Sequence, residues 1–128
     1  MAKEIFYAED TPYQPGYYTV KVHHGAFLLN STTGSFNIIQ ARLLNLSYVQ
    51  YLRFCRDVLG ATIVGKNCTY PYACFKKGEN LNALIRLLNA RANEVLFERE
   101  HPDHKEHTDF VKQYKAQFKA VNKDVPHK

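Results

Sequence analysis

Five lysines near the end of this sequence recur at the spacing of helical turns. They are Lys105, Lys112, Lys115, Lys119 and Lys123. On a helix with about 3.6 residues per turn they lie within one arc, opposite Phe110, Tyr114 and Phe118. A row of ammonium groups can follow a phosphate backbone by charge, whereas specific base contacts usually involve arginine. This lysine stripe predicts binding to the backbone of DNA or RNA without sequence specificity; the alternative is an ordinary solvated helix face.

Other basic residues extend this candidate site if the fold places them beside the stripe. Lys66, Lys76 and Lys77 lie in or next to a predicted hairpin. The chain has 17 basic and 12 acidic residues and a net charge of +5, whereas residues 1–50 are balanced. The basic excess therefore lies in residues 51–128, which favours a polyanionic partner for that part of the chain.

The tyrosines predict a different interaction surface. Tyrosine is enriched in protein interfaces, and exposed aromatic rings also stack on single-stranded bases. The alternative function is therefore a protein-binding module or inhibitor, of the accessory type with which phages and mobile elements block host proteins. Its candidate residues are Tyr13, Tyr17, Tyr18, Tyr70 and Tyr72.

Three histidines, His101, His104 and His107, follow one another at intervals of three residues among acidic side chains. Imidazole and carboxylate groups are common ligands of zinc and nickel. However, His101 precedes Pro102 outside the predicted helix, and the other two histidines lie toward different sides of that helix. We therefore expect capping and surface roles for this cluster, and neither a metal nor another cofactor.

The three cysteines have no C-x-x-C spacing. Cys55 lies on the apolar side of a predicted helix and Cys74 in a predicted strand, so both are expected to be buried. Cys68 lies in a turn close to Lys66 and is the candidate reactive thiol.

An enzyme would need either Cys68 with a base or the histidine cluster. The sequence has no Walker loop, G-x-G-x-x-G turn, H-E-x-x-H helix or G-x-S-x-G elbow. It also lacks the aromatic motif of an RNA-recognition domain, a GXXG loop and a zinc knuckle. We therefore expect a small basic binding protein rather than an enzyme, and assign no catalytic residue.

The elements that must position these groups begin with short strands. Alternating side chains predict a strand over residues 17–22, with another at residues 4–8. Turn residues on either side predict further strands at 26–30 and 36–39, which would complete a small meander. Residues 61–65 and 69–75 are typical of a later hairpin, whose second strand lies at an edge or begins after Pro71.

Three helices follow from capping signals and helical periodicity. Ser47 and Gln50 form a capping box for a helix that ends at Gly60, with Tyr48, Leu52, Cys55 and Leu59 on its apolar side and Gln50 opposite. Apolar residues on two sides predict a central helix over residues 80–97. Asp103 and Glu106 predict the start of a third helix, which ends near residue 122. The buried side of this third helix is expected to comprise Phe110, Tyr114, Phe118 and Val121.

Together these elements predict one α+β domain over residues 1–128, a small antiparallel sheet packed against about three helices, with a frayed tail at 124–128. The chain is 45% hydrophobic and 23% charged, which excludes a disordered or collagen-like protein. It has no apolar run of membrane-spanning length, so we expect a cytoplasmic protein without a membrane partner. A homodimer is the alternative if a second chain, rather than the third helix, covers the second apolar side of the central helix.

Overall fold

A computed structural model describes residues 4–11, 15–22, 33–65, 67–103 and 109–121. Its strands are β1 (Phe6–Asp10), β2 (Tyr17–Val22), β3 (Thr62–Val64) and β4 (Tyr72–Lys76). Its helices are α1 (Thr33–Leu43), α2 (Tyr48–Asp57), α3 (Glu79–Glu100) and α4 (Asp109–Val121). The described residues confirm the α+β class, with one more helix than the sequence predicted.

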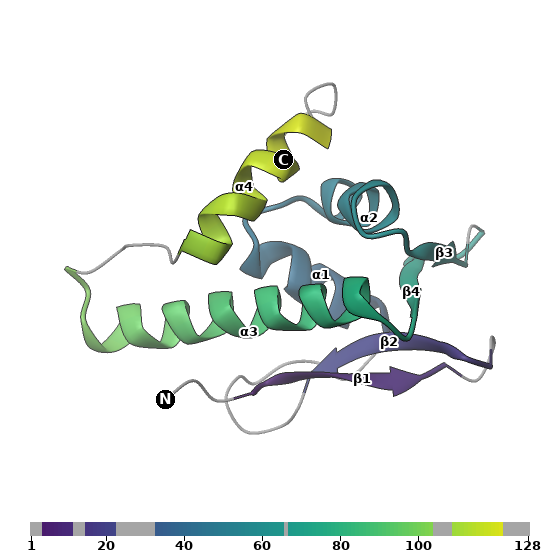
Figure 1. Ribbon diagram of the computed structural model, residues 1–128, viewed down its shortest axis with the longest axis horizontal. Helices are drawn as coiled ribbons and strands as arrows, with labels where there is room; N and C mark the ends of the chain where they lie inside the picture. The colour runs from purple at the N-terminus through teal and green to yellow at the C-terminus, as the bar shows by residue number, and fades with distance from the viewer. Residues whose placement is uncertain (1–3, 12–14, 23–32, 66, 104–108, 122–128) are drawn as a thin grey trace.

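The four strands form one antiparallel sheet in the order β1-β2-β4-β3. β1 and β2 pair along their length, whereas β2 and β4 pair only at Tyr17–Lys76 and Tyr18–Phe75. Figure 1 shows the consequence: β4 and β3 turn away from the β1–β2 ribbon. The strand at 17–22 and the later hairpin are confirmed, and β4 begins after Pro71 because proline has no amide for the ladder.

The predicted strand at residues 36–39 is wrong, because this segment belongs to α1. The buried positions of α1 are Asn37, Gln40 and Ala41, followed by Leu44 just after the helix, which is the spacing of one helix face. Two of these four residues are polar, so the buried face of this helix is not an apolar stripe in the sequence. The predicted strand at 26–30 lies outside the described residues.

The capping box of α2 is confirmed. The Ser47 side chain accepts a hydrogen bond from the Gln50 amide at 3.2 Å, and the Gln50 Oε1 accepts one from the Ser47 amide at 2.9 Å. The prediction that Gln50 is exposed is wrong, because this reciprocal bond holds it in the buried side of the helix. The buried side of α2 also includes Tyr51, Phe54 and Cys55. It is therefore rotated about the helix axis from the predicted apolar side, of which Tyr48 and Leu52 are only half-buried.

The core lies between the sheet and the helices, with α3 at its centre (Figure 1). The fully buried leucines of α3 are Leu84, Leu87 and Leu88. One side of α3 packs on β1, while α1 and α4 pack against others. The chain itself therefore contacts this helix from several sides, while Phe97 near its end is 49% exposed.

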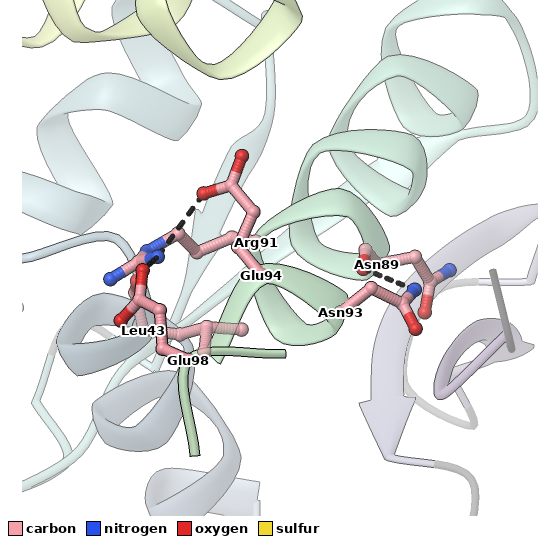
Figure 2. Close-up of polar contacts among 6 residues, drawn as sticks. All are labelled: Leu43, Asn89, Arg91, Asn93, Glu94 and Glu98. Atoms are coloured by element: carbon pink, nitrogen blue, oxygen red, sulfur yellow. Dashed lines mark hydrogen bonds and ion pairs between the residues drawn. The ribbon is translucent and has the colours of Figure 1, made fainter. Parts of the chain in front are cut away.

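Two polar side chains of α3, Arg91 and Asn89, form hydrogen bonds to neighbouring segments of the chain. Figure 2 shows the contacts of Arg91. The Arg91 guanidinium donates to the Leu43 carbonyl at the end of α1 at 3.0 Å and pairs with Glu94 at 3.1 Å and Glu98 at 3.5 Å. The Asn89 Oδ1 accepts hydrogen bonds from the amides of Ile5 and Phe6, and its Nδ2 donates to the Phe6 carbonyl. Asn89 thus supplies backbone partners to the outer edge of the sheet, where no other strand of the described residues pairs with β1.

No helix in the described part of the chain is both long and apolar enough to cross a membrane.

Candidate nucleic-acid interface

The orientation of α4 is set by an aromatic contact with α2. The Phe54 ring lies edge-on to Phe118 with the ring centroids 4.5 Å apart, and edge-on to Tyr114 at 5.9 Å. Val111 and Phe118 are buried, and Tyr114 is half-buried. The predicted buried side is confirmed for Tyr114 and Phe118; the side chains of Phe110 and Val121, and residues 104–106 of the predicted N-terminal cap, lie outside the described residues.

Because this side of α4 faces the core, the lysine stripe faces solvent. Lys112, Lys115 and Lys119 are exposed. They span two helical turns, about 10 Å along the axis. Residues 111–120 contain these three lysines and no acidic residue. Lys105 and Lys123, the outer members of the predicted stripe, lie outside the described residues.

Several other cations of the described residues are held by carboxylates. Arg91 is paired with Glu94 and Glu98 where α3 meets α1, and Lys21 pairs with Glu9 across the β1–β2 ribbon at 3.0 Å. Arg56 donates to its neighbour Asp57, which lowers the pKa of that carboxyl group. α4 itself has 13 residues and begins with Asp109, and its residues 111–120 contain no acid.

The remaining predicted lysines do not lie on α4. Lys76 ends β4, and Lys77 follows it in the short turn before α3. The Lys76 Nζ lies 5.7 Å from the centroid of the Tyr17 ring, a cation–π contact across the β2–β4 pair. Lys66 lies outside the described residues. The structure therefore divides the described basic candidates into an α4 group and a β4–α3 group.

The tyrosines of the predicted protein-binding surface differ in how far they are exposed. Tyr17, Tyr18 and Tyr72 are half-buried, Tyr18 packs against the core, and Tyr13 lies outside the described residues. Tyr70 is 53% exposed. The four described tyrosines therefore do not present one continuous set of exposed rings.

Tyr70 instead joins an exposed apolar group that the sequence did not predict. Its ring lies edge-on to Tyr48 with the centroids 6.3 Å apart, and Val49, beside Tyr48 on the first turn of α2, is 58% exposed. The Tyr48 hydroxyl donates to the Pro71 carbonyl, and partial burial raises its pKa to about 12. Val49 could have been noticed in the sequence as an apolar residue on the polar side of the predicted helix.

The histidine and cysteine candidates are placed as follows. His101 is exposed and stacks on Phe97 with the ring centroids 4.3 Å apart, while His104 and His107 lie outside the described residues. No three histidine, cysteine or acidic side chains of the described segments gather into a metal site. Cys55 and Cys74 are buried and Cys68 is exposed, as predicted.

No protein-family model, curated protein or solved structure matches this chain.

Proposed function

We propose that this protein binds the sugar–phosphate backbone of nucleic acids through the exposed lysine face of α4. The observation that carries this proposal is the combination of three exposed lysines and no acidic residue in residues 111–120. The aromatic packing of α4 on α2 supports it, because it holds the lysines on the solvent side of the helix.

The expected mode of binding is electrostatic. Each lysine that neutralises a phosphate releases condensed counterions, so affinity falls steeply as salt is added. The face has lysine and no arginine, which favours point-charge contacts to phosphates over bidentate contacts to base edges. Binding of this kind requires no catalytic group and does not distinguish one sequence from another.

The first test is a fluorescence-anisotropy titration of short single- and double-stranded DNA and RNA at several salt concentrations. Three phosphate contacts predict a log–log salt slope of about −3 on duplex DNA. The double variant Lys112→Gln/Lys119→Gln is expected to weaken binding and to reduce the slope to about −1, because two of the contacts are lost.

The matched control is Lys76→Gln/Lys77→Gln, which removes the same charge from a different part of the surface. If net charge alone drove binding, both double variants would weaken it equally, and the assignment to α4 would be wrong. Failure of every probe to bind near physiological salt would refute the proposed function. The exposed group of Tyr48, Val49 and Tyr70 would then be the place to look for a protein partner.

A further inference from the structure

A polar cleft lies where β4 passes into α3, with a volume of about 540 Å³. Lys76, Lys77 and Asn80 line it together with Tyr17, while Leu59 and Phe75 supply apolar wall. Phe75 is only 2% exposed and Leu59 4%, so the apolar part belongs to the core itself. A volume of this size matches the range of small-molecule sites, about 300–1,000 Å³.

The cationic groups of the cleft are available to a ligand. Both lysines are exposed, and neither forms an ion pair within the described residues. The contact of Lys76 with the Tyr17 ring places its ammonium group beside the cleft. Two adjacent ammonium groups at one cleft favour a ligand with more than one negative charge, such as a phosphate monoester.

The acidic side chain in the same wall is Glu79, so the ionised side chains sum to one positive charge. Glu79 opens α3, whose N-cap residue Gly78 provides no side-chain hydrogen bond. The free amides of that first turn add positive potential on the same side of the cleft as the lysines. Lys76, Lys77 and the size of the cleft are the main features that favour an anionic ligand, and the amides of the first turn of α3 add to them.

We propose that this cleft binds a phosphorylated small molecule of mononucleotide size. Lys76 and Lys77 neutralise its phosphate, and Asn80 offers an amide group for a polar contact. The half-buried Tyr17 ring contacts its non-phosphate part. This site is separate from the lysine face of α4 and does not depend on nucleic-acid binding.

The test is a titration of the ¹⁵N-labelled protein with AMP, adenosine and inorganic phosphate, followed by backbone amide chemical shifts. AMP is expected to shift residues 76–81 and the Gly60 region, inorganic phosphate to shift the same amides more weakly, and adenosine to have little effect. The variant Lys76→Gln/Lys77→Gln should weaken AMP binding at least about tenfold, because both charge-assisted contacts are lost. Both side chains are exposed, so the remaining spectrum should be unchanged and will show that the variant is folded.

The control variant Lys112→Gln/Lys119→Gln should bind AMP as the unmodified protein does. The proposal is overturned if AMP causes no shifts, if its shifts persist in the Lys76/Lys77 variant, or if they map to α4. Equal binding of adenosine would exclude phosphate recognition, and equal binding of inorganic phosphate would exclude a mononucleotide-sized ligand. Because each double variant tests one surface, this site and the α4 interface can fail independently.

Discussion

Gln40 shows how a single polar residue can serve the core while concealing its helix from sequence analysis. It is 1% exposed, and its Nε2 donates to the Val20 carbonyl at 2.8 Å while its Oε1 accepts from the Tyr51 hydroxyl at 2.5 Å. Buried polar groups are tolerated when they are hydrogen-bonded in this way. Burial also raises the pKa of Tyr51 well above its ordinary value, so the hydroxyl stays protonated and able to donate.

The three thiols are expected to differ in reactivity. Burial raises the pKa of Cys55 to about 12 and that of Cys74 to about 11, and the thiolate is the nucleophilic form. Near pH 8 we therefore expect Ellman's reagent to modify only Cys68 rapidly in the native protein, and all three thiols after denaturation. The variant Cys68→Ser should show no rapid phase; a rapid phase in that variant would mean that a second thiol is exposed.

Among the elements, α3 joins the sheet to two of the helices, because it contacts β1, β4, α1 and α4. Its Arg91 reaches the end of α1, and its Asn89 reaches the start of β1. These contacts join segments that are 48 and 84 residues apart in sequence. No local pattern in the sequence indicates such pairings, because each depends on where two distant segments meet.

The hydrogen bonds of Asn89 to the start of β1 are expected to contribute to stability. Asn89→Ala removes the partner of the Ile5 and Phe6 amides and of the Phe6 carbonyl, and we expect it to lower the free energy of unfolding by about 2 kcal/mol in urea denaturation. Asn89→Asp keeps the acceptor and should lose less. The matched control is Asn82→Ala on an exposed position of the same helix, for which we expect a change within about 0.5 kcal/mol. Equal losses in Asn89→Ala and Asn82→Ala would show that the edge contact contributes nothing.

At the scale of the whole molecule, the order of the layers decides which apolar surfaces are covered. In Figure 1, α3 lies along the β1–β2 ribbon with α2 and α4 on its other side, while α1 packs against α3 and also contacts β2. The homodimer that the sequence left as an alternative would place a second chain on α3; among the described residues β1, α1 and α4 contact this helix, and Phe97 near its end is 49% exposed.

This arrangement predicts a monomer in solution. Sedimentation velocity at micromolar concentrations should give a species close to the chain mass of 14.8 kDa. A species of twice that mass would contradict this expectation. Charge changes at Val49 and Phe97, which are exposed apolar side chains on α2 and α3, would then identify the contact.

Features that depend on neighbouring residues could be predicted from the sequence: the capping box at Ser47, the strand over residues 17–22, and a helix over residues 80–97, which extends to Glu79–Glu100 in the structure. The sequence also placed three lysines of residues 111–120 on one face of a helix, because helical spacing is a local property.

Only the tertiary structure decided which side chains are buried and which distant groups meet. It showed that residues 36–39 are helical, with Asn37 and Gln40 buried, that Lys76 and Lys77 line a cleft between β4 and α3, and that Val49 and Tyr70 are exposed next to the half-buried Tyr48. The physical reason is that burial and long-range hydrogen bonds are set by packing between elements, and packing overrides the local preference of a polar or short segment.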